Sequence, residues 1–416
     1  MTTESDETTL SDLLSRRSVR SLLISQSAAS SASVGLAITM GVFVFDLTGS
    51  EADIGYVGFA EFLPTFALVL WAGSLADRFD RRRLAALAFT AQALVAFTIA
   101  WYVTTDSVSI LPLLGLTTAF GVARGFANPA ARALPTNVVA ERELPRLVPV
   151  LSTTWQLSLA LAPLVVGAVY GIGPAWTFVA IGLLDLTAAA AILTVKLHAA
   201  QQRTPRATFG QALQGLKLVA ATPLLLAAIG LDLFAVLLGG VVALAPAIAT
   251  ELLDAPDGAA FWIRSAGGVG AVVTAALLAW RPIERRVGRA LLQAVAVFGL
   301  ITIGVAFSRS LVVTLALFAG LAAADMVSVY VRATIVPLAT PDSLRGRVLA
   351  VEAVFIGASN ELGAFESGLT AEWFGLVPAI VVAGVATLVV VAGFAVAVPD
   401  LRQLDNFAEI RHDARP

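Results

Sequence analysis

The chain has 416 residues, of which 58% are hydrophobic and 13% are charged, and its formal net charge is −2. A soluble globular protein carries about 25% charged residues, so a chain this poor in charge must have lipid around much of its surface. It contains no cysteine, which excludes disulfides, thiolate metal sites and thiol catalysis.

The basic residues that nucleotide or zinc chemistry would need are badly placed. Lysine occurs only at Lys196 and Lys217, and neither follows a glycine-rich loop or precedes Ser or Thr, as a P-loop lysine must. The two histidines, His198 and His412, fall in polar segments, which argues against a zinc site inside the membrane. We therefore expect no cofactor and no enzymatic activity, and any pumping would draw on an ion gradient or a partner.

The N-terminal segment 1–18 is polar and lacks an apolar run before a small-residue cleavage site. It predicts a tail and no cleaved signal peptide. Beyond it, apolar runs of about 20 residues, the length that crosses a bilayer, recur twelve times. These runs predict spanning helices near 19–47, 52–76, 83–105, 109–133, 146–170, 174–196, 223–250, 259–280, 289–308, 310–336, 347–371 and 374–398.

Basic residues gather in alternate loops between the predicted helices. The basic set is Arg78, Arg81, Arg82, Arg83, Arg142, Arg146, Lys196, Arg203, Arg206, Lys217, Arg281, Arg285, Arg286, Arg289, Arg345 and Arg347. The remaining loops hold mainly acids, with Arg264 and Arg309 as their bases. By the positive-inside rule, this bias predicts a multi-pass protein of the cell (plasma) membrane with both termini in the cytoplasm.

The one long interior loop, 199–222, divides the predicted helices six and six. The basic clusters that follow 52–76 and 259–280 stand at matching positions of the two sets, which indicates duplication. The sequence thus predicts an all-α membrane protein of two pseudo-symmetric six-helix bundles, 19–198 and 223–398, with a cytoplasmic C-terminal tail at 399–416. Such halves commonly enclose a binding site near the middle of the bilayer.

A distinctive motif ends the predicted helix 52–76. It runs Gly73-Ser74-Leu75-Ala76-Asp77-Arg78-Phe79-Asp80-Arg81-Arg82-Arg83. Gly73 would let helices approach closely, and Asp77 could accept hydrogen bonds from a helix N-terminus or pair with an arginine. Together with Arg78, Arg81 and Arg82, these residues predict a conformational latch. The alternative is plain topology, since arginines belong in any cytoplasmic loop.

This motif resembles the loop 2–3 signature of the major facilitator superfamily, a group of secondary transporters. Further segments resemble the branch that includes the enterobactin exporter, the transmembrane secretion effectors: 45–50, 128–130, 231–240, 345–348 and 359–368. The resemblance implies twelve transmembrane helices and alternating access. The stretch 161–167 keeps Pro163 and Gly167 but lacks the flanking glycines of the drug–proton antiporter motif, which weakens an antiporter assignment.

Ionisable residues at membrane depth are costly when they face lipid and should face the bundle interior. They include Glu61, Arg124, Asp185, Asp232, Asp325, Glu352, Glu361 and Glu366. The acids outnumber the bases, and a carboxyl that alternates between protonated and ionised forms is what proton coupling needs. The candidates for substrate binding or proton coupling are Glu61, Arg124, Asp232, Asp325, Glu361, Asn360 and Gln156. Each could instead make a structural ion pair or an interhelical hydrogen bond.

The resemblance implies export of a small amphipathic organic molecule, such as a siderophore, metabolite or drug, and the intramembrane carboxylates favour proton antiport. The expected partners are the lipid bilayer, a small-molecule substrate and protons, with a monomeric chain and no nucleic acid, because the basic loops lack interleaved aromatics. Two alternatives remain: an uptake permease, and a non-transporting membrane sensor on the same scaffold.

Overall fold

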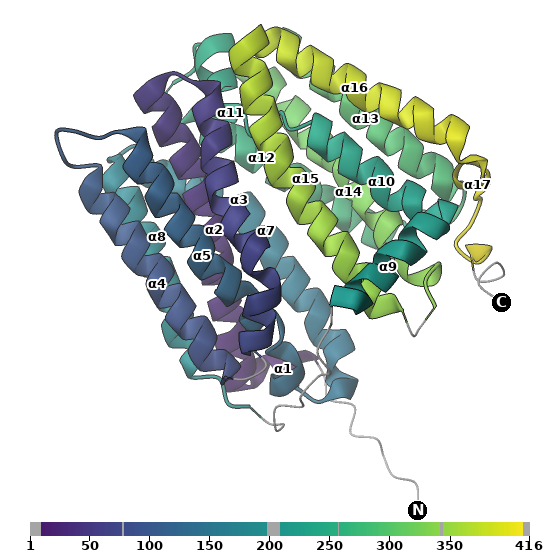
Figure 1. Cartoon of the computed structure of the whole chain (residues 1–416), viewed down its shortest axis with the longest axis horizontal. Coiled ribbons are helices and arrows are strands. Elements are labelled where there is room, and N and C mark those ends of the chain that lie inside the picture. The colour runs from purple at the N-terminus through teal and green to yellow at the C-terminus, as the bar shows by residue number, and fades with distance from the viewer. Residues whose placement is uncertain (1–9, 77–78, 198–208, 257, 342–343, 411–416) are drawn as a thin grey trace, which may run out of the picture. The chain divides into compact units, whose positions relative to one another are not determined.

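The computed structural model describes residues 10–76, 79–197, 209–256, 258–341 and 344–410. Every regular element in these ranges is a helix (Figure 1). The helices are α1 (Leu10–Ser15), α2 (Arg17–Thr48), α3 (Glu51–Ala76), α4 (Arg81–Tyr102), α5 (Ile110–Arg132), α6 (Pro135–Val138), η1 (Glu141–Glu143), α7 (Leu144–Tyr170), α8 (Pro174–Leu193), α9 (Phe209–Ala221), α10 (Pro223–Leu238), α11 (Ala245–Ala247), η2 (Ile248–Leu252), α12 (Ala259–Trp280), α13 (Val287–Phe307), α14 (Leu311–Leu338), α15 (Arg345–Phe374), α16 (Leu376–Ala397) and α17 (Pro399–Gln403).

Most of these helices are long and apolar. Within the described residues, ten are long and apolar enough to cross a membrane, and the bent pair α9–α10 raises the count to eleven. A further long helix, α3, has 26 residues. The twelve predicted spans are consistent with this count, and the chain is an all-helical, multi-pass membrane protein.

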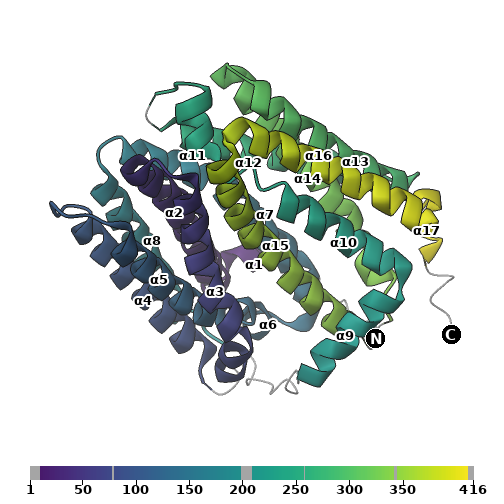
Figure 2. The ribbon, with the colours of Figure 1, turned by 45° about the horizontal axis from the view of Figure 1, so that its top comes forward.

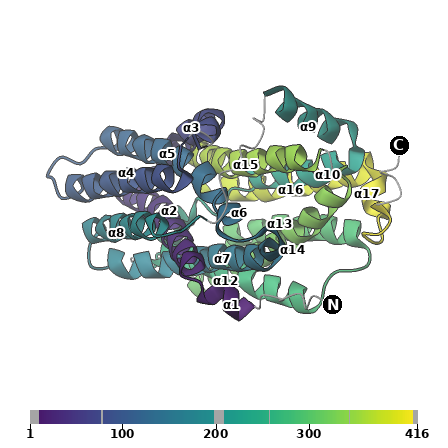
Figure 3. The same cartoon turned by 90° about the horizontal axis from the view of Figure 1, so that it is seen from below.

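The helices form two compact units, residues 1–39 with 60–205 and residues 40–59 with 206–416. In the first unit, α4 packs against both α5 and α8 (Figure 3). The packed faces are rich in small side chains, with Ala85 and Ala88 of α4 and Ala189 of α8 in one buried cluster with Phe89. Small residues let helix backbones approach within a membrane, where close packing replaces the hydrophobic effect as the source of association.

In the second unit, α13 packs against α14 and α16, and α10 packs against α15 (Figures 1 and 2). Its core is built from larger aliphatic side chains, among them Leu231, Leu291, Val295, Val331 and Ile335. The end of α2 and the start of α3 belong to this unit. There the rings of Tyr56 and Phe59 lie 5.7 and 5.0 Å from the ring of Phe365 on α15.

One predicted helix is wrong. The run 223–250 is not continuous, because α10 ends at Leu238 and the chain turns before the short α11 and the π-helical turn η2. Gly239 and Gly240 mark the break. A Cβ at Gly240 would lie 2.4 Å from the carbonyl oxygen of Gly363 on α15, so only glycine fits where these two backbones meet.

The segment 199–222 contains a helix that the sequence analysis does not predict. Residues 209–221 form α9, and Val219 of this helix is buried in the core of the second unit. α9 meets α10 at an angle of 100°, at Pro223, the first residue of α10, where proline is tolerated because its missing N–H has no helical partner. Residues 198–208 lie outside the described ranges, and the assignment of 199–222 as a linker between six-helix halves stays a prediction.

Candidate functional site

Two groups of buried charges stand out, one in each unit. In the first unit, Glu61 of α3 forms an ion pair with Arg124 of α5. Glu61 is only 3% exposed, whereas the Arg124 side chain is 26% exposed. The sequence analysis selected both residues, and the structure brings them together. A buried ion pair seldom adds net stability, because desolvation offsets its attraction, so its presence needs another reason.

The backbones of α3 and α5 meet beside this pair. A Cβ on Gly121 would lie 2.2 Å from the carbonyl oxygen of Glu61. The hydroxyl of Thr65, one helical turn beyond Glu61, lies 2.8 Å from the carbonyl oxygen of Gly121. Pro64 lies in the interior of α3 at the same level. The crossing therefore holds α3 and α5 close together beside the Glu61–Arg124 pair, because a side chain at Gly121 would not fit.

In the second unit, Arg332 of α14 lies between two acids from different helices. It forms an ion pair with Asp232 of α10, and its Nε lies 3.2 Å from Oε1 of Glu352 on α15. All three residues are buried. When all three are ionised, the group carries one net negative charge, and one proton on either carboxyl makes it neutral. The sequence analysis selected Asp232 but missed the roles of Arg332 and Glu352.

A small cavity adjoins this triad. It comprises about 230 Å³ of space between atoms, part of it open to the surroundings, and is lined by Asp232, Asp325 and Ser328, among others. Asp325 lies seven residues before Arg332 on α14, but Arg332 pairs with acids of α10 and α15. The buried hydroxyl of Ser328 has no hydrogen-bond partner within the described ranges. The cavity therefore places two carboxyls and an unsatisfied hydroxyl around one space.

Glu361 of α15 lies within electrostatic range of Arg264 on α12. Arg264 also donates a hydrogen bond of 3.1 Å to the carbonyl oxygen of Val242, in the break after α10. The same carbonyl oxygen accepts only a long bond, of 3.4 Å, from the backbone N–H of Ala245, so Arg264 supplies its shorter hydrogen bond within the membrane. The sequence analysis assigned Arg264 to loop topology and missed this role.

Two predicted site residues do not join these groups. The exposed side chain of Asn360 donates to the carbonyl oxygen of Ile356, within its own helix, at 2.8 Å. Gln156 of α7 is half-buried. Their assignment to substrate binding stays a prediction.

One further acid is buried more deeply than the acids of the ion pairs described above. Asp185 of α8 is 0% exposed, and both of its oxygens lack hydrogen-bond partners among the residues that the structure describes. Burying an ionised carboxylate without a counter-charge costs much free energy. Asp185 is therefore a further candidate for proton exchange. Its only signal in the sequence is an acid within an apolar run.

The predicted latch is described in part. Asp77 and Arg78 lie outside the described residues, and Gly73 lies in the last turn of α3. Arg81 is buried at the start of α4 and donates to Oδ1 of Asn137 at 3.0 Å. Arg82 forms a 2.8 Å ion pair with Asp80 and donates to the carbonyl oxygen of Val195 at 2.8 Å. Both arginines thus tie the start of α4 to other segments of the first unit.

Two ion pairs at this end of the unit, Asp80 with Arg82 and Arg16 with Glu143, change the pKa of their members. Asp80 is the N-cap of α4 and accepts a 2.9 Å hydrogen bond from the backbone N–H of Arg82. Hydrogen bonds from the Arg82 side chain, above all, lower the pKa of Asp80. Arg16 donates two hydrogen bonds, of 2.9 and 2.8 Å, to Glu143, and this contact raises the pKa of Arg16.

No group of three or more histidine, cysteine, aspartate or glutamate side chains is arranged to hold a metal ion in the part of the chain that the structure describes. The polar groups present are carboxyls, arginines and hydroxyls. This arrangement suits proton exchange and the binding of polar groups on a small molecule.

Residues 8–415 match the family described as transmembrane secretion effector. The chain belongs to this family. It is a member of the major facilitator superfamily, as its motifs indicated, and the match covers both units. No curated protein matches the chain.

Solved transporters share its fold. A bacterial homologue of the human lysosomal transporter Spinster has 14% identity and a TM-score of 0.72, over 91% of this chain and 96% of that one. The nucleoside transporter NupG, as a D323A mutant, has 12% identity and a TM-score of 0.74, over 91% and 99%. A D-xylose–proton symporter has 15% identity and a TM-score of 0.70, over 90% and 96%. These likenesses confirm the predicted major facilitator fold.

Proposed function

We propose that this protein is a secondary active transporter that exports a small amphipathic organic molecule, such as a siderophore, metabolite or drug, in exchange for protons. The observation that carries the proposal is a buried arginine, Arg332, that lies between the carboxyls of Asp232 and Glu352. Such a group is costly within a membrane and is expected where it serves an ion or substrate pathway.

The triad suits proton exchange because it has one more acid than base. With Arg332 paired to one carboxyl, the other carboxyl can take up or release a proton while the arginine keeps a counter-charge. The adjoining cavity with Asp325 gives that proton a polar neighbour. Glu61, Arg124 and Glu361 supply further polar groups at membrane depth, for binding the substrate or orienting it.

The setting of the protein is part of the proposal. We place it in the plasma membrane as a monomer, with both termini and the basic loops in the cytoplasm, and assign it no enzymatic activity and no nucleic-acid partner. The motif from Gly73 to Arg82 acts as the latch that holds one conformation, with Arg81 and Arg82 anchoring the start of α4.

Uptake is the second candidate for the direction of transport. Proteins with the same fold include a D-xylose–proton symporter and a nucleoside transporter, so the fold is compatible with either direction. A non-transporting sensor is the third candidate. A sensor needs no surplus of buried acid over base, so the triad favours a proton-coupled transporter over a sensor. Export is preferred to uptake because the family is described as a transmembrane secretion effector.

The test begins with a substrate screen. A strain that lacks the protein is compared with one that overproduces it, and compounds retained only by the deletion strain are identified by mass spectrometry. Each hit is then offered to inverted membrane vesicles with an acidic interior. Export in exchange for protons predicts accumulation inside these vesicles and its loss when a protonophore collapses the gradient.

Three results contradict the proposal. Accumulation that the protonophore leaves unchanged rejects proton coupling. Accumulation only in right-side-out vesicles rejects export and favours an uptake permease. A screen in which the deletion strain retains no compound favours the sensor.

A further inference from the structure

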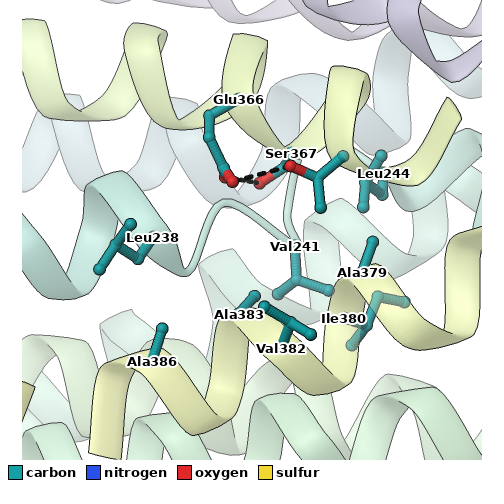
Figure 4. Close-up of a pocket in the computed structure, with 11 residues that line it drawn as sticks. Leu238, Val241, Leu244, Glu366, Ser367, Ala379, Ile380, Val382, Ala383 and Ala386 are labelled. Atoms are coloured by element: carbon teal, nitrogen blue, oxygen red, sulfur yellow. Dashed lines mark hydrogen bonds between the residues drawn. The ribbon is translucent and has the colours of Figure 1, made fainter. Parts of the chain in front are cut away.

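A second cavity in the second unit lies apart from the buried charges. It encloses about 370 Å³ of empty space, including its open side, between the break after α10, α15 and α16 (Figure 4). Leu238, Val241 and Leu244 come from the region of the break, and Ile380 and Ala383 come from α16. The break creates this space, because α10 turns away at Gly239 where a continuous helix would fill it.

Glu366 of α15 is the one ionisable side chain in the lining. Its carboxylate accepts hydrogen bonds from the hydroxyls of Thr370, at 2.8 Å, and Ser367, at 3.5 Å. These bonds hold the carboxylate toward the apolar wall of α16, as Figure 4 shows. Glu366 is thus a positioned carboxylate in a pocket whose other lining residues are two hydroxyl side chains and apolar ones.

No cation balances Glu366 within the described part of the chain. Its interactions there are with the two hydroxyls alone. The walls offer no base either, because α16 contains no ionisable residue and the only one in α10 is Asp232. The other charged groups of α15 beyond its middle, Glu361 and Glu372, are acids as well. A pocket of this kind has the charge of a cation site.

One residue of the pocket wall is exposed on α16. Val382 lines the pocket and is itself 59% exposed. Val385 and Val389, three and seven residues further along α16, are 45% and 65% exposed, so the three valines form one apolar stripe on the helix. An apolar chain that leaves the pocket at Val382 would run along this stripe in contact with lipid.

We propose that this pocket binds the ammonium head of an amphipathic monocation, with its alkyl chain along the valine stripe of α16. Glu366 supplies the counter-charge, and the walls from the break and α16 exclude water around the pair. An anionic head would meet an acid and no base, and a neutral head would leave the carboxylate unpaired. The ammonium could belong to a membrane lipid or to a dissolved amphiphile.

The test measures binding alone, so its failure would leave the transport proposal standing. The whole protein in maltoside micelles is titrated with decylammonium and with decanol, and bound ligand is counted by native mass spectrometry. The proposal predicts that decylammonium binds and that decanol, with the same chain and no charge, binds at least about tenfold more weakly, as expected for loss of a charge-assisted hydrogen bond.

Three variants locate the site. Glu366→Gln keeps the shape and removes the charge, and Ala383→Leu keeps the charge and fills the pocket. Both should weaken decylammonium binding about tenfold or more. Glu284→Gln, an equal change of charge at an exposed loop residue, should bind as the wild type does. Equal binding by Glu366→Gln and wild type, or equal binding of decanol and decylammonium, overturns the proposal.

A competition arm identifies the source of the ammonium. Phosphatidylethanolamine is added to the micelles before decylammonium, with phosphatidylglycerol as the lipid without an amine. Displacement by phosphatidylethanolamine that depends on Glu366 assigns the site to a lipid headgroup. Displacement by neither lipid assigns it to a dissolved amphiphile. Equal displacement by both, in the wild type and in Glu366→Gln, shows that the lipids compete by chain alone and overturns the role of the carboxylate.

Discussion

The two units solve the same problem, a charge inside a membrane, in different ways. In the first unit, one acid meets one base across a glycine crossing, Glu61 with Arg124 over Gly121. In the second unit, one base meets two acids, Arg332 with Asp232 and Glu352. The first pair is neutral when both members are ionised, whereas the triad is neutral only when it holds one proton.

This difference separates two tasks that a proton-driven transporter must perform. A neutral ion pair beside a close helix crossing is suited to present polar groups at a fixed depth in the membrane. A group with a surplus acid is suited to change its proton count without losing its counter-charge. If this division is correct, changes at the triad should alter stability and proton exchange, and changes at the crossing should alter packing.

The largest effect is expected from Arg332→Met. The change leaves two buried carboxyls without a cation, which costs about 3–5 kcal/mol when a buried pair is broken in this way. We expect the unfolding temperature in detergent to fall by several degrees. The chain has no cysteine for thiol-reactive dyes, so its seven tryptophans provide the signal.

Two variants serve as controls for this prediction. Arg289→Met removes an exposed arginine of α13 and should leave the unfolding temperature unchanged. Adding Asp232→Asn and Glu352→Gln to Arg332→Met removes the stranded charges and should restore most of the loss. A triple variant as unstable as the single one would show that packing, and not charge, holds the triad together.

Gly121→Ala tests the crossing of the first unit and has the next largest effect. Its Cβ would lie 2.2 Å from backbone at Glu61, so α3 and α5 must separate, at a cost of about 1–3 kcal/mol, as for other overpacked sites. The matched control is Gly115→Ala on the same helix, where nothing lies within 4 Å of the added methyl. The control should be neutral or stabilise by up to ~1 kcal/mol. Equal unfolding temperatures for the two variants would refute the tight crossing.

The sequence predicts the helices well because lipid imposes their length and hydropathy. Hydropathy fails at Gly239 and Gly240, since it measures side chains and the break depends on backbone contact with Gly363. The glycine pair, followed by Pro246, was the available signal. The helix α9 was missed because its residues are too mixed for an apolar run, although Val219 is buried in the core.

Sequence reasoning found the buried acids, and Arg124 among the bases, but not which groups pair. An acid within an apolar run is conspicuous because its burial is costly. Which base it meets depends on how helices distant in sequence pack. Asp325 and Arg332 lie two turns apart on α14, yet the structure pairs Arg332 with acids of α10 and α15. The role of Arg264 was hidden in the same way, because it depends on the break after α10.

Glu352→Gln sharpens the comparison with a smaller effect on stability. Arg332 keeps Asp232 as its counter-charge, and the amide oxygen can still accept from Nε, so we expect a cost of about 1 kcal/mol, the scale of one hydrogen bond. Proton exchange should be lost, because the surplus acid is gone. The measurement is the pH inside liposomes loaded with a pH-sensitive dye when substrate is added. Glu284→Gln is the control, and proton release by Glu352→Gln at the wild-type rate would assign the triad a structural role.

The smallest effect is expected at the charged end of the first unit. Asp80→Asn removes the carboxylate that pairs with Arg82, while the amide oxygen still caps α4, so the loss should be about 0.5 kcal/mol, the scale of a half-exposed ion pair. Bonding with Arg82 holds the pKa of Asp80 below its ordinary value of 3.8. The native state therefore binds this proton less tightly than the unfolded state, and the stabilisation is present above pH 3.8 and disappears as pH falls through the lowered pKa. The difference in unfolding temperature between wild type and Asp80→Asn should thus be constant near neutral pH and shrink below about pH 4. A difference that persists undiminished at pH 3 would mean that the substitution acts through packing or hydrogen bonding and not through the charge of Asp80.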